Sequence, residues 1–473
     1  MFLVRKIAGI IFAEANNMKI FTKSVLLLVV AAMVFALFGC SSQQRNYGDL
    51  PESYEPEVGG KIRVTCRSDV YPNESSQSAV RNWISAFRDK YPDVSVEVDF
   101  NTSDYAPQIA AKSIGDVIYL DDSLVYQYAI TDEALMPLDS YIEVYGIDME
   151  NLYAGITDLG VANGKYYMAA MTCGQFSFVY NLDAMREAGL LGDDEIIPNN
   201  WTWDDFKTYC SALVQTNEDG TYSQMGAVYA LTNSAFYQPF FLGYGGKWYD
   251  TVNKKINLAS DDKVVQGVSE LIGALEKGYI YPAGINVGST WGTLYSNINY
   301  TSDCVFQFLA ALTVLPTTGA TLDKLGINWE ITTWPSFEYA ASPCGTLGFG
   351  VFSYSKNADT AAALVLTLYT EEGQYAIHSQ TGGDVPVIKS LGDQDFWHLN
   401  INGWEEKNYS AFVANYERYV PGQISGVLPP DIASIVSSGW TDLLTSWFQS
   451  GASWQDKLAE IEEECNQTWL TLS

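Results

Sequence analysis

The residues best placed to bind a small molecule are Asp121 and Asp122, which directly follow the apolar run VIYL at 117–120. Such a run predicts a buried strand, and in open α/β sheets the side chains just beyond the carboxyl ends of strands face the ligand crevice. A carboxylate there can accept two hydrogen bonds from neighbouring hydroxyl groups. One of the two acids could instead cap a following helix, and both alternatives stay open.

Two aromatic residues also lie near predicted strand ends. Tyr71 follows the first predicted strand, and Trp334 stands before Pro335 at the end of a later one. Flat aromatic rings pack on apolar C–H faces, and ligand pockets combine such rings with a few placed polar groups. The alternatives are an exposed loop position for Tyr71 and packing beneath the neighbouring chain for Trp334.

Catalytic and metal chemistry has less support in the sequence. The two histidines, His378 and His398, have no metal-ligand spacing, no CxxC or GxSxG occurs, and we expect neither a metal site nor a cofactor. A glycoside hydrolase needs two carboxylates about 5–5.5 Å or about 6.5–9.5 Å apart. The chain has many acidic residues, and two of them could form such a pair. A secreted glycoside hydrolase is therefore the alternative to a binding protein.

The composition disfavours several partners. The 473 residues include 26 Lys and Arg against 56 Asp and Glu, a formal charge of −30. No basic surplus remains to bind phosphate backbones, anionic lipid surfaces or anionic solutes, so we expect no nucleic-acid partner. Aromatic residues make up 14% and hydrophobic residues 47% of the chain, which is long enough for two or three domains.

Strand and helix patterns alternate along the chain. Residues 61–67 and 94–100 alternate apolar and polar positions, and residues 80–91 between them have helical spacing before Pro92, which together predict a βαβ unit. Thr202 with Asp205, and Asp261, predict helix starts. Ala362, Leu366 and Tyr369 mark a further predicted helix that ends near Gly382 and Gly383, and two more helices are predicted over 432–448 and 454–469. The tryptophans on helical stripes, Trp83, Trp454 and Trp469, are assigned to cores. We therefore expect two α/β lobes.

The first forty residues indicate export. From Met18, two lysines precede an uncharged apolar run at 25–38 that ends in Gly39 and Cys40, with polar residues following. This pattern is typical of a secretory signal peptide. Its ending resembles the lipobox of bacterial lipoproteins, in which the cysteine becomes the lipidated N-terminus. A single transmembrane helix is the alternative. Residues 1–17 fit an upstream start that was assigned in error.

Processing at this site would leave Cys40 as the lipid-anchored residue, outside the cytoplasm and attached to the cell membrane. Residues 40–59 are polar, carry two prolines and would form a flexible tether. Removing residues 1–39 changes the formal charge from −30 to −33. Six cysteines then remain; Cys66, Cys210 and Cys465 lie on apolar phases and are predicted to be buried free thiols, although one disulfide among the six stays possible.

A family resemblance enters at residues 161–190, VANGKYYMAAMTCGQFSFVYNLDAMREAGL. This segment resembles the carbohydrate-type extracellular solute-binding proteins of ABC importers, in which G-K-x-Y, a small-residue strand and Y-N-x-D-x-x-x-x-A-G-L follow one another. Other stretches resemble family marks in the same order: 79–92, 116–138, 200–206, 245–248, 355–357 and 372–374. Together these stretches span most of residues 60–390.

The resemblance implies two lobes joined by a hinge that the chain crosses more than once, closing on a solute in a central cleft. It implies delivery of that solute to a membrane permease driven by a separate ATPase; this chain has no GxxxxGK[ST] loop of its own. It also places Thr172 and Gln175 where the chain crosses between lobes, and Phe236 and Tyr237 on an aromatic rim of the second lobe. A buried helix start is the alternative for Phe236 and Tyr237.

We expect an N-terminal lobe of residues 60–172 plus about 346–384 and a C-terminal lobe of residues 173–345 plus about 385–473. The predicted protein is a monomeric, lipid-anchored, non-enzymatic binding protein for a neutral sugar or oligosaccharide, with ABC permease subunits as partners. An adhesion or structural lipoprotein would explain the anchor but not the α/β lobes.

Overall fold

The structure, a computed structural model, describes residues 50–51, 54–192, 195–379, 384–399, 401 and 403–472. The predicted signal, Cys40, the first part of the tether and the helix end expected near Gly382 and Gly383 lie outside these ranges. None of the helices within them combines the length and the apolar character that crossing a bilayer requires.

The first lobe is built on a five-stranded sheet with the order β2-β1-β3-β17-β6. Its strands β1 and β2 are parallel, as are β1 and β3, whereas β17 runs antiparallel to β3. The bounds of the five strands are β1 Lys61–Arg67, β2 Ser95–Thr102, β3 Val117–Asp121, β17 Leu347–Val351 and β6 Ala169–Ala170. The predicted βαβ unit is therefore present.

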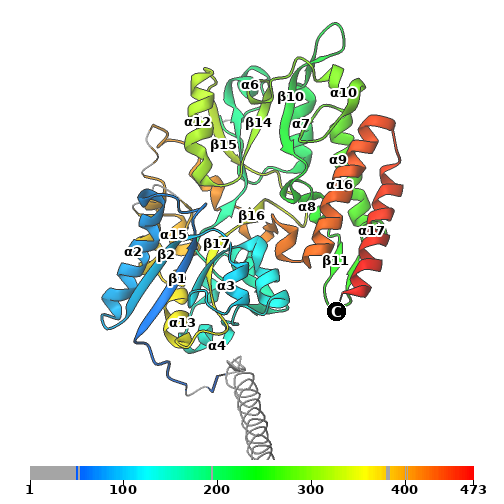
Figure 1. Ribbon diagram of the computed structural model, residues 1–473. Coiled ribbons are helices and arrows are strands. Elements are labelled where there is room, and N and C mark those ends of the chain that lie inside the picture. Colours follow the sequence, from blue (N-terminus) through cyan, green and yellow to red (C-terminus); the bar gives the residue numbers. More distant parts are fainter. Residues whose placement is uncertain are drawn as a thin grey trace, which may run out of the picture. The chain divides into compact units, whose positions relative to one another are not determined.

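Helices lie against this sheet (Figure 1), and α2 packs into its core through buried apolar side chains. Asn73 caps α2 by accepting a hydrogen bond from Ser76 N, and the buried side chains of Trp83 and Phe87 join the core of the β1 residues. The bounds of the helices in this lobe are α2 Glu74–Lys90, α3 Ala106–Ala110, α4 Asp139–Val144, α5 Ala154–Thr157, α13 Ala358–Leu366, α14 Glu371–His378 and α15 Lys389–Gly392.

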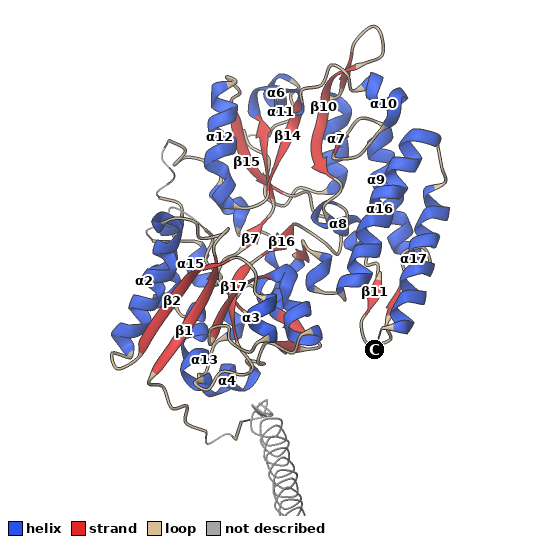
Figure 2. Cartoon of the chain, viewed as in Figure 1, coloured by secondary structure: helices blue, strands red, loops and turns tan. Residues whose placement is uncertain are grey.

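The second lobe has a sheet with the order β13-β10-β14-β8-β15, and the short β9 pairs with β10 (Figure 2). Strand β10 is parallel to β13 and β14, so the carboxyl ends of these three strands meet at one edge. The bounds are β8 Ser177–Asn181, β9 Gln215–Thr216, β10 Tyr222–Ala230, β13 Ile280–Ala283, β14 Cys304–Leu309 and β15 Trp329–Thr333.

Two helices of the second lobe begin at the caps that the sequence predicts. Thr202 and Asp205 form the capping box of α7, and the Asp261 side chain caps α9. The last two helices, α16 and α17, pack on each other and on this lobe. The bounds are α6 Leu182–Glu187, α7 Trp203–Leu213, α8 Gln238–Gly243, α9 Asp262–Glu276, α10 Gly288–Leu294, α11 Tyr300–Asp303, α12 Leu315–Lys324, α16 Pro430–Ser450 and α17 Trp454–Thr471.

Three short strands carry the chain from lobe to lobe and form a small sheet of their own, here called the hinge sheet. They are β7 Gly174–Gln175, β16 Pro343–Gly345 and β18 Val420–Pro421, in the order β18-β16-β7. Two hairpins complete the strands, β4 Val161–Ala162 with β5 Lys165–Tyr166 and β11 Tyr249–Asp250 with β12 Lys255–Ile256. The chain thus makes three crossings.

The segment after the second crossing packs differently from the expected division. Residues 385–388 pack with the first lobe, where Val387 O accepts from Tyr153 N and Ile388 bridges Leu152, although we expected residues from about 385 onward in the second lobe. Residues 404–412 contact the second lobe, because Trp404 Nε1 donates to Asp323 of α12 and Asn408 N donates to Glu330 of β15. The lobe boundaries stay a prediction.

All six cysteines among the described residues are buried and free. The prediction of buried thiols for Cys66, Cys210 and Cys465 is confirmed, and burial raises the pKa of each of these thiols. Their packing is that of small hydrophobic residues.

Candidate functional site

The first lobe presents a charged edge. Because β1 and β3 are parallel, Arg67 at the end of β1 and Asp121 at the end of β3 come to the same edge of the sheet. Arg67 Nη2 lies 2.5 Å from Asp69 Oδ2, and Arg67 Nη1 lies 3.6 Å from Asp121 Oδ2. A register shift in the β1–β2 pairing between Thr65 and Arg67 accompanies this placement. The guanidinium lowers the pKa of Asp69 through the hydrogen bond between them.

Asp121 is partly open at this edge. Its carboxylate accepts a hydrogen bond from Ser123 Oγ, and 29% of its side chain is exposed. Asp121 stands at the N-cap position of the 3₁₀ turn η1 Asp122–Leu124, but its side chain caps no backbone N–H. The Asp121 side chain therefore does not act as a helix cap, and its carboxylate can accept further hydrogen bonds.

Asp122 is buried, with 7% exposure. Burial raises the pKa of this carboxyl to about 7, and the charge of neighbouring Asp121 adds to the effect. Its backbone N–H donates to Thr346 O at 3.1 Å, next to the hinge sheet. Asp122 therefore exchanges a proton near neutral pH at the point where the first lobe meets the hinge.

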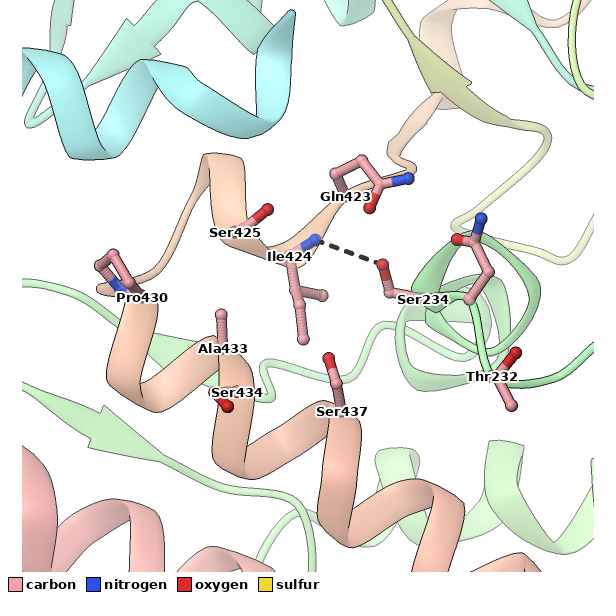
Figure 3. A pocket seen from close by; sticks show the side chains of 10 residues that line it. Thr232, Ser234, Gln423, Ile424, Ser425, Pro430, Ala433, Ser434 and Ser437 are labelled. Carbon is pink, nitrogen blue, oxygen red and sulfur yellow. Dashed lines mark hydrogen bonds between the residues drawn. The ribbon is translucent and has the colours of Figure 1, made fainter. Parts of the chain in front are cut away.

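The second lobe presents an uncharged edge. Residues Thr232–Ser234 follow the carboxyl end of β10 and line a cavity of about 490 Å³ (Figure 3). The remaining lining comes from the third crossing and the first turns of α16. The full lining is Thr232, Asn233, Ser234, Gln423, Ile424, Ser425, Pro430, Ala433, Ser434 and Ser437. Hydroxyl and amide groups dominate it, and such groups both donate and accept hydrogen bonds without adding charge.

Part of this cavity wall is held in place by its own hydrogen bonds. Ser234 Oγ donates to Gly422 O at 2.7 Å and accepts from Ile424 N at 3.3 Å, the contact drawn in Figure 3. Asn233 Oδ1 accepts from Ala235 N at 3.0 Å. These bonds join the end of β10 to the loop that follows β18.

The same loop connects the two edges. The 3₁₀ turn η11 Ile424–Gly426 contacts η1, and a Cβ at Gly426 would lie 2.6 Å from Asp122 O. Only glycine permits this approach of backbone to backbone. The loop therefore rests on the residues after Asp121 while it lines the cavity of the second lobe, so the charged and uncharged edges are neighbours.

The predicted aromatic contacts are buried in this structure. Trp334 is 0% exposed; its ring stacks on Phe178 with 4.8 Å between centroids, and Tyr229 lies at 4.9 Å. Its neighbour Phe236 is 1% exposed. Tyr237 packs on Trp440 of α16, and Tyr71 packs edge-on against Tyr119 of β3. The structure gives these four residues packing partners and does not bring them into the cavity lining; their contact with a ligand stays a prediction.

Thr172 and Gln175 lie at the first crossing, as the resemblance implies. Thr172 is 3% exposed, and its carbonyl accepts from Thr346 Oγ1 at 2.6 Å. Gln175 is 0% exposed and hydrogen-bonds to Ser342 and Tyr419. A ligand contact by either residue also stays a prediction.

Within the described ranges, no group of three or more His, Cys, Asp or Glu side chains is arranged to hold a metal ion. His378 is buried against Met171 O at 3.1 Å, and burial lowers its pKa to about 4. This histidine is a neutral core residue.

Sequence reasoning missed several residues of the two edges. Arg67 had a usable signal, because it is a cation at the last position of a predicted strand, and the carboxyl end of such a strand lies at the ligand edge. Asn233 likewise follows a strand. Gln423, Ser425 and Ser434 had none, because only the third crossing brings them to the end of β10.

Comparison with known proteins now decides the family. Residues 71–375 match the sequence profile described as bacterial extracellular solute-binding protein. The chain belongs to this family. The prediction of an extracellular solute-binding protein is confirmed, and the match supports the binding-protein class over the hydrolase alternative.

Solved structures confirm the two-lobe fold of this solute-binding family. The ABC substrate-binding protein Lmo0181 from Listeria monocytogenes, in complex with cycloalternan, has a TM-score of 0.61 at 17% identity, covering 87% of this chain and 99% of its own. The sugar-binding protein MalE from Xanthomonas citri has a TM-score of 0.67 at 16% identity, covering 87% and 98%. UgpB from Mycobacterium tuberculosis, in complex with glycerophosphocholine, has a TM-score of 0.60 at 19% identity, covering 87% and 98%. No curated protein matches the chain.

Proposed function

We propose that this protein is a lipid-anchored extracytoplasmic solute-binding protein that captures a neutral sugar or oligosaccharide and delivers it to an ABC import permease. The observation that carries the proposal is the uncharged, hydroxyl- and amide-rich cavity at the strand ends of the second lobe. It lies beside the carboxylate edge of the first lobe, in a chain of the solute-binding family.

The chemistry of the two edges supports a neutral polyhydroxylated solute. Each sugar hydroxyl donates one hydrogen bond and accepts others, so Asp121 can accept from a hydroxyl while Asn233, Gln423 or Ser434 can donate or accept. A cationic solute would find no carboxylate in the cavity lining and would meet Arg67 beside Asp121 at the charged edge, and an anionic one would meet a chain with a formal charge of −30. A cavity of about 490 Å³ is within the usual range for small-molecule sites.

The structural neighbours favour the same class. Lmo0181 is described with cycloalternan and MalE from Xanthomonas citri as sugar-binding. UgpB is described with glycerophosphocholine, so a zwitterionic phosphodiester is the competing ligand class. The charge of this chain and the absence of a cation in its cavity lining favour the sugar.

The anchor and the permease rest on the sequence. Cys40 after the apolar run supports lipidation, and capture outside the membrane requires a permease partner for uptake. We expect a monomer that binds without catalysis. Mass spectrometry of the mature N-terminus tests the anchor, and an intact Met1 would contradict it.

Isothermal titration of the purified protein against a panel of neutral oligosaccharides, with glycerophosphocholine and dipeptides as competing classes, tests the ligand. We expect one neutral glycan to bind with a dissociation constant in the micromolar range or below and to be recovered unchanged after overnight incubation. Binding of glycerophosphocholine or peptides alone would contradict the sugar, and hydrolysis of the glycan would contradict binding without catalysis.

A further inference from the structure

The three strands of the hinge sheet approach each other unusually closely. Each crossing contributes one glycine: Gly174, Gly345 and Gly422. A Cβ at Gly174 would lie 2.7 Å from Gly345 O, and a Cβ at Gly422 would lie 2.8 Å from Cys344 O. Small residues in these strands therefore let the three crossings pack backbone to backbone.

Backbone hydrogen bonds join these strands only in pairs. Strand β16 is central and pairs with β7 on one side and β18 on the other. The two outer strands, β7 and β18, are not neighbours in the sheet order. The backbone ladder therefore leaves the first and third crossings without a direct link.

The side chain of Gln175 supplies that link. Its Nε2 donates to Ser342 Oγ at 2.8 Å, and its Oε1 accepts from the Tyr419 hydroxyl. The three residues come one from each crossing, since Gln175 is in β7, Ser342 precedes β16 and Tyr419 precedes β18. An amide suits this position because it offers a donor and an acceptor on one short group.

The bonds of Gln175 are made inside the protein. The residue is 0% exposed, so its amide has no contact with solvent in this structure. A buried amide that lost one partner would bear the cost of an unsatisfied polar group, which makes the three-residue arrangement cooperative. We call Gln175, Ser342 and Tyr419 the crossing lock.

We propose that Gln175 is a positioning residue that couples the three crossings and thereby sets the equilibrium between separated and closed lobes. The proposal rests on the proposed function, because closure of the lobes on a solute is the motion concerned. Any rotation of one lobe against the other must pass through these three strands, since they connect the two lobes. A side chain that holds all three together makes them move as one unit.

Amide hydrogen exchange on the solute-free protein tests the crossing lock. Gln175→Leu removes both side-chain bonds of Gln175, while Tyr419→Phe and Ser342→Ala each remove one of these two bonds and keep the packing; Tyr419→Phe also removes the 3.4 Å contact of the hydroxyl with Phe412 O. We expect exchange to accelerate together in peptides covering 173–176, 342–345 and 418–422, by about 2- to 10-fold for each bond lost. In a Gln175→Leu background, Tyr419→Phe should add less than it does alone, because the shared bond is already gone and only the long contact with Phe412 O remains to be lost.

Gln374→Leu is the matched control. Gln374 is also 0% exposed, but its Nε2 donates to Leu368 O at 2.7 Å and to Met171 O at 3.4 Å, and its Oε1 accepts from Val387 N at 2.9 Å, so it bonds neither the second nor the third crossing. Its loss should accelerate exchange around these three partners and leave 342–345 and 418–422 unchanged. Small-angle X-ray scattering without solute should differ from wild type for Gln175→Leu and not for Gln374→Leu.

Acceleration confined to 173–176 in Gln175→Leu, or spread evenly over both lobes, would overturn the proposal. So would full additivity of Gln175→Leu and Tyr419→Phe. If Gln175→Leu does not fold, the two single-bond variants give the same readout. None of these measurements uses a solute, so they stand or fall independently of the sugar assignment.

Discussion

The two lobes bring opposite chemistry to their neighbouring edges. The first lobe ends β1 and β3 in an ion-pair cluster of Arg67, Asp69 and Asp121, whereas the second ends β10 in Thr232, Asn233 and Ser234 with no charge. Its aromatic residues near the strand ends are enclosed in its own core. The difference teaches that an aromatic-rich sequence does not by itself make an aromatic binding surface.

We expect the largest effect, a loss of folding stability, from substitution of Trp334 in the second lobe. Trp334→Ala should destabilise the protein by about 3–5 kcal/mol, because a large buried ring between Phe178 and Tyr229 is lost. Urea denaturation measures this loss, and titration with the glycan that the oligosaccharide panel selects should show the affinity of the folded protein changed by less than about threefold.

Trp83→Ala in the first lobe is the matched control, because Trp83 is equally buried. Both variants should lose stability. A stable Trp334→Ala protein with lost affinity would instead make Trp334 a ligand contact and remove the contrast between the lobes.

Asp122 tests the hinge side of the charged edge through pH. Its folded pKa of about 7 lies above the unfolded value, so the folded state holds a proton that the unfolded state has released. The contribution of Asp122 to stability is therefore highest below pH ~4 and falls as pH rises to ~7. Between pH 4 and 8, wild type should lose about 2–4 kcal/mol of unfolding free energy relative to Asp122→Asn.

Urea denaturation at one-unit pH steps measures this difference. Asp69→Asn is the control, because Arg67 lowers the pKa of Asp69 and the difference then has the opposite sign. Parallel stability curves for wild type and Asp122→Asn would show that Asp122 is ionised throughout.

Asp121 tests the charged edge as a ligand site. Asp121→Ala should weaken glycan binding about 10- to 100-fold, because a hydrogen bond to a charged group is lost and Arg67 loses one of its two partners. Glu97→Ala is the matched control, since Glu97 of β2 pairs with Lys61 of β1 at 2.5 Å near the opposite end of the same sheet. Equal affinity in both variants would place the solute elsewhere.

The uncharged edge should give the smallest effect. Ser434→Ala removes one neutral hydrogen-bonding group from the cavity and should weaken binding about 2- to 10-fold, measured by calorimetry. Ser438→Ala, one turn further along α16 and bonded to Ser434 O, should leave affinity unchanged. If Ser434→Ala lost more affinity than Asp121→Ala, the uncharged edge would contribute more to binding than the charged edge, contrary to our expectation.

Local chemistry made much of the fold predictable. The capping residues Thr202 and Asp261 act within one helical turn, so their helices begin as expected. The helix expected from Ala362 to near Gly382 is instead divided: α13 ends at Leu366, and Thr370 caps α14 by accepting from Gly373 N. Thr370 could have been recognised in the sequence as a helix cap. The apolar spacing of Ala362, Leu366 and Tyr369 instead favoured one continuous helix.

Long-range contacts limit the prediction of the site. The place of Asp121 could be predicted from the sequence, because it follows directly from the end of a strand. The burial of Trp334 could not be predicted in this way, because it depends on Phe178 and Tyr229 from other strands. The bonds of Gln175 join residues 167 and 244 positions apart. No spacing rule reaches that far, because such contacts follow from topology.

A crystal structure of the protein with its tightest-binding neutral oligosaccharide tests the central claim most directly. We predict sugar hydroxyls within hydrogen-bonding distance of Asp121 on one side and of the cavity lined by Asn233, Gln423 and Ser434 on the other. A sugar bound away from both edges, or a charged solute in their place, would contradict the account.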